Sequence, residues 1–229
     1  MTRDVFKYYK TTMVIIFFFI YEMVIMELLK YIGIDTNNLS ATSLTGLLFI
    51  VDLIEITIFF FVYYNDMKND INDFKTNFKK YIKFAFKWWL IGLAIMYASN
   101  IILYFIVNTG ATNEEIVQEQ IKRLPFYMLI STSITAPFTE EVVFRKSIRD
   151  IFTNKYLYII ASFLLFGGVH VLSSNSLLEL LYIIPYGTFG AVFAYMYYKT
   201  NNIYTSMFIH FIHNFLIVTL SIIQVFLGV

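Results

Sequence analysis

The chain has 229 residues, of which 59% are hydrophobic and 20% aromatic, and its mean hydropathy is +0.67. Only 14% of the residues are charged, against about 25% in a typical soluble domain, so the composition predicts a polytopic membrane protein. A net charge of +1 gives no indication of a basic surface for a nucleic-acid partner. The sequence has no cysteine, which excludes disulfides, thiolate catalysis and cysteine-ligated zinc.

Seven apolar segments follow one another along the chain. Each is long enough, at about 1.5 Å per residue, to cross or nearly cross a hydrocarbon core of about 30 Å. They are continuous runs without the alternation of a membrane barrel, so helices are favoured. The predicted fold is all-α, a polytopic bundle of seven transmembrane helices that forms a single integral membrane domain over residues 1–229. The segments cover residues 12–33, 43–65, 82–108, 124–147, 156–173, 177–198 and 203–227.

Polar stretches separate these segments and predict the connections between helices. The longer ones are residues 35–41, 65–80 and 108–123, and the last three connections are short. The first apolar segment follows three basic residues, like the start of a signal peptide. It is too long for a signal peptide and has no small-residue cleavage site, so we expect a retained membrane anchor.

The basic residues predict the orientation in the membrane. If the N-terminus lies in the cytoplasm, fourteen of the 17 lysines and arginines fall on cytoplasmic segments, which is a strong positive-inside bias. The C-terminus would then lie outside. The abundance of Ile, Asn, Lys, Tyr and Phe indicates a bacterial source, so we expect a bacterial plasma membrane. The three basic residues on the outer side would be Lys30, Lys122 and Arg123.

The fourth segment carries a cluster of charged residues in an apolar setting, where charges are costly and usually functional. Glu140 and Glu141 are neighbours that point about 100° apart on a helix, whereas Glu141 and Arg145 are four residues apart and share a face. One carboxylate can therefore pair with the guanidinium while the other stays free as a general base. The alternative is a simple Glu–Arg pair at the membrane interface.

A second Glu-Glu pair in the polar stretch 108–123 serves as a comparison. Glu114 and Glu115 are followed by Glu119 at the position where Arg145 stands in the other cluster. We interpret this pair as a solvated acidic face.

A histidine near the end of the fifth segment is the next candidate. Phe166 precedes His170 by one turn, and two glycines between them would let another helix approach closely. Close approach suits an imidazole that must reach a group on a neighbouring helix. The alternative is a histidine that only hydrogen-bonds between packed helices.

The seventh segment places His210 and Asn214 on one helix face, with His213 one step round from them. An imidazole N–H and an amide NH₂ that converge on one point could form an oxyanion hole. The alternative is polar contacts that hold helices together, a frequent use of Asn and His in membrane bundles. We expect His213 to support the site without acting in it.

The three motifs together resemble a known family. Glu-Glu-x-x-x-Arg, then Phe-x-x-x-His, then His-x-x-x-Asn, in this order on three of the last four predicted helices, resemble the CPBP family of intramembrane proteases. That family includes the CAAX prenyl endopeptidases and the bacterial Abi-type proteins. The resemblance covers about residues 124–218, the motif-bearing core, and the first three segments carry no motif that matches.

The resemblance implies an intramembrane endopeptidase whose catalytic cavity lies among the last four helices and opens to the cytoplasmic side. Glu140 and His170 would activate water, and His210 with Asn214 would stabilise the oxyanion. Glu141 and Arg145 would form a supporting ion pair, with Phe166 and His213 beside them. It also implies a membrane-associated peptide or protein as substrate and a role in bacteriocin or signal-peptide maturation or in self-immunity.

The same residues allow a metal site as an alternative to a metal-free mechanism. Glu140, His170 and His210 could in principle hold zinc with an open coordination position. The helices have no His-Glu-x-x-His arrangement, and resemblance to the CAAX endopeptidases favours a glutamate mechanism without a cofactor. We therefore expect no metal.

Two other classes of function remain open from the sequence. A non-catalytic immunity protein could bind a peptide in the same cavity. A proton-coupled transporter could use the same acids and histidines, but no matching pair of Gly/Pro-interrupted segments appears in two halves of the chain. The oligomeric state has no signal in the sequence.

Two features complicate the predicted site. From the expected helix ends, Glu140 and His210 lie near the cytoplasmic side, whereas His170 is three residues before the outward connection at residues 173–176. Either the fifth helix is short or the predicted ends are wrong by a turn. In addition, Pro137 precedes Glu140 by three residues and would bend the fourth helix or shift its hydrogen bonds.

Overall fold

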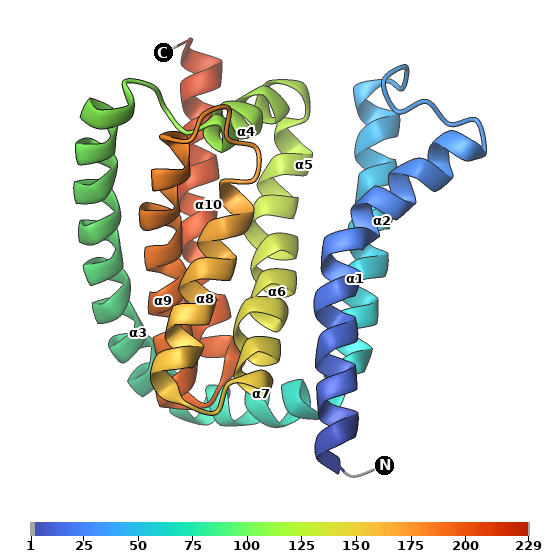
Figure 1. Ribbon diagram of the computed structural model, residues 1–229. Coiled ribbons are helices and arrows are strands. Elements are labelled where there is room, and N and C mark those ends of the chain that lie inside the picture. The colour runs from blue at the N-terminus through green and yellow to red at the C-terminus, as the bar shows by residue number, and fades with distance from the viewer. Residues whose placement is uncertain (1–2, 229) are drawn as a thin grey trace.

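The computed structural model describes residues 3–228, and this part of the chain contains helices and no strand. Figure 1 shows the helices standing side by side, with the N-terminus at one end of the bundle and the C-terminus at the other. The elements in chain order are α1 (Arg3–Tyr31), α2 (Ala41–Val62), α3 (Tyr64–Val107), α4 (Thr112–Arg123), α5 (Pro125–Ile130), η1 (Ser131–Thr135), α6 (Ala136–Glu141), η2 (Val142–Ser147), α7 (Ile148–Ile151), α8 (Lys155–His170), η3 (Glu179–Tyr182), α9 (Ile183–Thr200) and α10 (Ile203–Leu227).

The predicted all-α membrane bundle is confirmed. Five helical stretches are long and apolar enough to span a membrane, namely α1, α2, α3, η3 with α9, and α10. The apolar helix α8 is shorter, at 16 residues, and the run from α5 to α7 is helical throughout but changes type along its length. The predicted number of seven transmembrane helices is therefore not confirmed. Helices this apolar make the chain an integral membrane protein.

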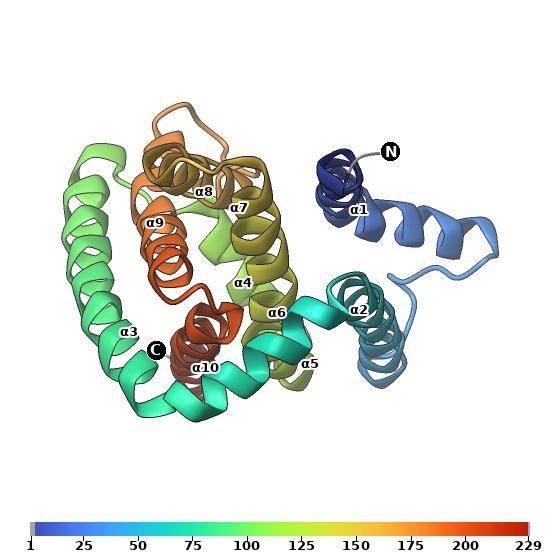
Figure 2. The same cartoon turned by 90° about the horizontal axis from the view of Figure 1, so that it is seen from below.

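The predicted connection at residues 65–80 is wrong, because this stretch is the first part of α3. It is polar but amphipathic: Met67 and Phe74 are buried on one face, and lysines occupy the other. In Figures 1 and 2 this part of α3 crosses one end of the bundle before the helix turns to run along it. Asn202 fixes it there, donating from Nδ2 to the Asp70 carbonyl at 2.7 Å.

The stretch 108–123, also predicted as a connection, contains the amphipathic helix α4. Figure 1 places α4 across the end of the bundle where the C-terminus lies. The two ends of the bundle are therefore each crossed by a polar helical segment, the start of α3 at one and α4 at the other.

Helices α8 and α9 pack against each other through glycines. A Cβ on Gly190 would lie 2.6 Å from the Ser162 carbonyl oxygen, and one on Gly187 would lie 2.8 Å from the Phe163 ring. Gly167 is equally close to α9, since a Cβ there would lie 2.8 Å from the Ile183 carbonyl oxygen. Such distances are shorter than a Cβ contact normally allows, so glycine at these positions lets the two helices approach this closely.

Helices α1 and α2 stand beside the motif-bearing helices, as Figure 2 shows. At the end of the bundle near the N-terminus, ion pairs connect α1 with the rest of the fold. Lys7 lies 3.0 Å from Asp150 of α7, and Lys10 lies 3.7 Å from Asp66 of α3. Several of the basic residues assigned to the cytoplasm thus gather at one end of the bundle.

Candidate active site

The helix that carries the two glutamates is interrupted by wider turns. Segments η1 and η2 are π-helical and flank the single α-helical stretch α6, at whose end Glu140 and Glu141 stand. In η1 the Ala136 N–H donates to the Ser131 carbonyl, five residues back, so the next carbonyl, that of Thr132, would need a donor from Pro137. Proline has no N–H, so that carbonyl is left without its helical partner. Short π-helical turns of this kind often occur at functional sites.

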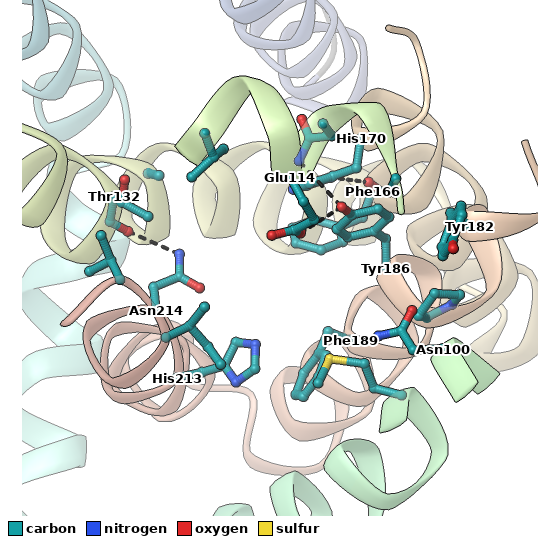
Figure 3. Close-up of a pocket in the computed structure, with 18 of the residues that line it drawn as sticks. Asn100, Glu114, Thr132, Phe166, His170, Tyr182, Tyr186, Phe189, His213 and Asn214 are labelled. Atoms are coloured by element: carbon teal, nitrogen blue, oxygen red, sulfur yellow. Dashed lines mark hydrogen bonds between the residues drawn. The ribbon is translucent and has the colours of Figure 1, made fainter. Parts of the chain in front are cut away.

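Asn214 of α10 supplies the missing donor. Its Nδ2 donates to the Thr132 carbonyl at 2.9 Å, as Figure 3 shows. The bond joins α10 to the π-helical turn and fixes the orientation of the amide. One of the two N–H groups of Asn214 therefore has a structural partner, and the other is available to the cavity.

The two adjacent glutamates have different environments. Glu141 is fully buried, and its Oε1 lies 3.2 Å from an Arg145 guanidinium nitrogen whose side chain is also fully buried. The Glu140 side chain keeps 17% of its surface exposed and lines a cavity. One carboxylate is thus tied to the guanidinium while the other faces open space.

Arg145 is enclosed by aromatic rings. Its guanidinium carbon lies 4.6 Å from the centroid of Phe166 and 5.5 Å from that of Phe193. Ring faces attract a cation, and the attraction is stronger when water is excluded. Phe166 therefore separates Arg145 from the cavity, which makes the arginine a buried counter-ion for Glu141 and not a group that can touch a substrate.

His210 lies between the two carboxylates. Its Nδ1 is 3.0 Å from Glu141 Oε1, and its Nε2 is 3.6 Å from Glu140 Oε2. Because an ionised Glu141 can only accept, Nδ1 carries the proton, and Nε2 can donate only when His210 has a second proton. With that second proton, the two carboxylates, the guanidinium and the imidazolium sum to zero charge, which suits a site with little water.

His170 is the last residue of α8 and is oriented by its own helix. Its Nδ1 lies 2.8 Å from the Phe166 carbonyl oxygen, so that nitrogen carries a proton and donates, which leaves Nε2 as the acceptor. The ring lies between Phe166 and Tyr186, with centroid distances of 4.8 and 4.7 Å, and is stacked on Tyr186 (Figure 3). No ring nitrogen of His170 is within the 4.0 Å ion-pair distance of Glu140 in the described part of the chain.

His213 faces the same cavity from α10 and is held by aromatic side chains. Its ring stacks on Phe189 at 4.2 Å, and its Nδ1 accepts a hydrogen bond from Trp89 Nε1 at 3.4 Å. The tryptophan belongs to α3, outside the motif-bearing core. This contact has no signal in the sequence, because nothing in the spacing of residues relates positions 89 and 213.

The cavity brings the predicted residues together. It has a volume of about 610 Å³ and is lined by Glu140, Phe166, His170, His210, His213 and Asn214, with further residues of α3, α4, η1, α6, η3, α9 and α10. Glu141 and Arg145 lie behind its wall. Each of the eight predicted site residues therefore lies in the cavity or directly behind it, although their roles in catalysis stay predictions.

The cavity has a buried end and an exposed end. Around Glu140 the lining residues His210, Phe166 and Phe193 are almost completely buried. At the other end Glu114 of α4 and Tyr104 of α3 are exposed. The cavity therefore opens toward α4, at the end of the bundle where the C-terminus lies.

This geometry resolves the predicted mismatch in depth. Helix α8 is indeed short and ends at His170, so the histidine lines the cavity along the way from α4 to Glu140. The expected opening to the cytoplasmic side does not fit the predicted orientation, however. If the N-terminal end of the bundle faces the cytoplasm, the cavity opens on the outer side.

Two residues of the cavity, Glu114 and Tyr186, belong to none of the three sequence motifs. The interpretation of a solvated acidic face fits Glu115 and Glu119, which are exposed. It does not fit Glu114, which lines the cavity and accepts a hydrogen bond from Tyr186 Oη at 2.7 Å. Tyr186 in turn stacks on His170. The partners are 72 residues apart, so no local pattern could have paired them.

The proposed zinc ligands Glu140, His170 and His210 do not form a metal-like cluster in the described residues. Within residues 3–228 no three histidine, aspartate or glutamate side chains converge as the ligands of one metal ion do. His170 and His210 each direct one ring nitrogen at a protein oxygen. Each histidine keeps its other ring nitrogen, and metal-bound histidines make the same kind of bond, so the expected absence of a metal stays a prediction.

Comparisons with known proteins agree with the motifs. Residues 122–216 match the model of the family described as type II CAAX prenyl endopeptidase Rce1-like. The chain is 27% identical over 146 residues to the protein named Putative membrane peptidase YdiL of Bacillus subtilis (strain 168), a match that covers 62% of this chain and 57% of that protein. It is 30% identical over 132 residues to UPF0177 protein YvdC of Lactococcus lactis subsp. lactis (strain IL1403), covering 55% of this chain and 49% of that protein.

The chain spans about half the length of these two relatives. No solved structure gives a significant match. The family match begins two residues before the predicted motif-bearing core and ends two residues before its end, and it contains all three motifs. The predicted resemblance is confirmed: residues 122–216 of this integral membrane protein match the Rce1-like family model of the CAAX prenyl endopeptidase type.

Proposed function

We propose that the protein is an intramembrane endopeptidase that hydrolyses a peptide bond in a membrane-associated peptide or protein. The observation that supports the proposal is the difference in environment between the adjacent Glu140 and Glu141. Glu141 is neutralised by Arg145 behind the wall, while Glu140 faces a cavity in which a water molecule and a peptide could meet. The Rce1-like match supports the same class of reaction.

In the proposed reaction Glu140 takes a proton from water as the water oxygen attacks the peptide carbonyl carbon. The carbonyl π electrons move to its oxygen, forming a tetrahedral oxyanion. When the oxyanion collapses, the C–N bond breaks and Glu140 returns its proton to the leaving amine. The products are a carboxylic acid and an amine, and the glutamate is regenerated.

The histidines and the asparagine have separate proposed roles. His170 holds the attacking water from the side of the cavity opposite Glu140, through the ring nitrogen that is not bonded to Phe166. His210 in its doubly protonated form and the free N–H of Asn214 stabilise the oxyanion. The proposed mechanism needs no metal, so dialysis against a strong chelator should leave activity unchanged.

Comparative peptidomics of membranes tests the proposal directly. Membranes from cells with the wild-type chain should contain cleavage products that are missing from membranes with Glu140→Gln, which keeps the side-chain volume but removes the base. Glu115→Gln, an exposed residue outside the cavity, is the matched control and should retain all products. The product sequences would also identify the substrate and show whether it belongs to bacteriocin or signal-peptide maturation.

The same experiment separates the peptidase from a non-catalytic immunity protein. An immunity protein that only sequesters a peptide would protect cells equally well with Glu140→Gln and would leave the peptide profile of the membranes unchanged. That result would overturn the proposed function.

A further inference from the structure

The lining of the cavity has a one-sided charge. Within residues 3–228 the lining has two carboxylates, Glu114 at the exposed end and Glu140 at the buried end, and no lysine or arginine. Arg145, the nearest candidate, is fully buried behind Phe166. The proposed imidazolium of His210 lies at the buried end, between Glu140 and Glu141. An anionic group at the mouth would therefore meet the Glu114 carboxylate and no lysine or arginine.

Glu114 is held in position at the cavity mouth. Tyr186 Oη donates to Glu114 Oε1 at 2.7 Å and accepts a hydrogen bond from Asn113 Nδ2 at 3.4 Å. The tyrosine hydroxyl has one proton, which it gives to Glu114, so the carboxylate acts as the acceptor, as its ionised form does. Within residues 3–228 the other carboxylate oxygen, Oε2, has no hydrogen-bond partner, and Glu114 makes no ion pair.

The start of α4 is itself fixed to the neighbouring segment between α8 and α9. Tyr182 Oη donates to the Thr109 carbonyl at 2.7 Å. Thr112 Oγ1 donates to Glu179 Oε2 at 2.5 Å and accepts from Asn175 Nδ2 at 3.0 Å. Glu114 is therefore preorganised, unlike an ordinary surface carboxylate that would lose side-chain freedom on binding a partner.

The mouth is also connected to the proposed catalytic groups. Tyr186 contacts Glu114 through its hydroxyl and stacks on His170 through its ring. Figure 3 shows Glu114, Tyr186 and His170 together on one side of the cavity. A group bound by Glu114 would thus be separated by one side chain, Tyr186, from His170, which is proposed to hold the attacking water.

We propose that Glu114 is a specificity-determining residue that selects substrates with a cationic group, either a lysine or arginine side chain or a free α-ammonium. The preference rests on the proposed peptidase function, because it concerns the peptide that occupies the same cavity. It also means that a free C-terminal carboxylate on the substrate finds no lysine or arginine at the mouth, so recognition there does not depend on it.

Binding and cleavage are measured separately to test the proposal. The probe is a short, apolar, fluorescently labelled peptide with one lysine placed in turn at each position, compared with norleucine and glutamate at the same position. A second pair carries a free or an acetylated N-terminus, and a third a free or an amidated C-terminus. Binding is measured by fluorescence anisotropy to Glu140→Gln, and cleavage is measured with the Glu140-containing enzyme.

We expect the best lysine or free-amine peptide to bind roughly three- to tenfold more tightly than its neutral counterpart, as for one hydrogen-bonded charge at a partly exposed site. Glu114→Gln, which keeps an oxygen for Tyr186, should remove this preference, and Glu114→Lys should reverse it in favour of the glutamate peptide. Glu115→Gln should leave the preference unchanged. Amidating the C-terminus should not weaken binding.

The lysine and N-terminal arms distinguish a side-chain cation from an α-ammonium. If Glu114→Gln retains the wild-type preference while peptides are still cleaved, the specificity proposal fails and the peptidase stands. If no peptide is cleaved but cationic peptides bind in a Glu114-dependent manner, the specificity proposal is supported and the peptidase fails. A strict requirement for a free C-terminal carboxylate would overturn the specificity proposal.

Discussion

Two Glu-Glu pairs mark the two ends of the cavity, and they show how far the same dipeptide can differ in chemistry. In Glu140-Glu141 the second residue is sealed against Arg145 and the first faces the buried end of the cavity. In Glu114-Glu115 the first residue is held by Tyr186 at the exposed end, and the second is exposed outside the cavity. The environment of each carboxylate, more than its sequence neighbour, determines its proposed role.

The largest expected effect is at the buried end. Glu140→Gln removes the proposed base without changing the side-chain volume, and loss of a general base typically costs about 10²–10⁴-fold in rate. We expect turnover to fall to the background level in an assay with purified protein, while Glu115→Gln keeps the wild-type rate. Comparable rates for Glu140→Gln and Glu115→Gln would contradict the role of Glu140 as the general base.

Arg145, the buried counter-ion of Glu141, should contribute more to the free energy of unfolding than an exposed charge does. Arg145→Met leaves the buried Glu141 with His210 but without its guanidinium counter-ion, and breaking a buried ion pair in this way costs about 3–5 kcal/mol. Lys79→Met, at an exposed position on α3, should change the free energy of unfolding by less than about 0.5 kcal/mol. Thermal unfolding in detergent measures both, and similar melting temperatures for the two variants would contradict the buried pair.

Asn214 has two roles in this account: its side chain donates to the π-helical turn at Thr132, and it is proposed to stabilise the oxyanion. Asn214→Ala should lower kcat by about 10²–10³-fold while leaving measurable turnover, as for loss of one oxyanion donor. Asn100→Ala, which also changes the cavity lining, should leave kcat close to that of the wild type. If Asn214→Ala lowers only the melting temperature and not kcat, its bond to Thr132 is its whole contribution.

The smallest of these effects concerns the scaffold that both ends share. Gly190→Ala would place a Cβ 2.6 Å from the Ser162 carbonyl oxygen, and overpacking of this kind costs about 1–3 kcal/mol. Gly46→Ala on α2 meets no atom within 4 Å and should be neutral or stabilising by up to about 1 kcal/mol. In detergent, Gly190→Ala should therefore lower the melting temperature relative to the wild type, whereas Gly46→Ala should leave it unchanged or raise it.

The sequence predicts the buried end of the cavity much better than its mouth. Apolar runs locate the spanning helices because hydrocarbon imposes length and composition on them, and charged residues inside those runs stand out. The amphipathic helices at residues 64–80 and 112–123 lack that signal, since they lie across the ends of the bundle and only part of each is buried. The pairing of Glu114 with Tyr186 depends on how distant helices pack, which no local spacing encodes.

The sequence also gives no consistent prediction of the side of the membrane to which the cavity opens. The orientation was predicted from lysines and arginines, and the cytoplasmic opening from the family resemblance, and each prediction is independent of the other. Only the structure relates them, because it places the exposed end of the cavity at α4 and the basic ion pairs at the opposite end.

The central claim is that Glu140 and Glu114 lie at the two ends of one cavity that opens at α4. Single cysteines at positions 114, 140 and 170 test it in a chain that has no cysteine of its own. With a membrane-impermeant thiol reagent applied to one side at a time, all three should react from the same side, position 114 fastest and position 140 slowest. Blocking position 114 with a bulky reagent should slow the reaction at position 140 in a double-cysteine chain. Reaction of position 140 only from the side opposite to position 114 would contradict the shared cavity.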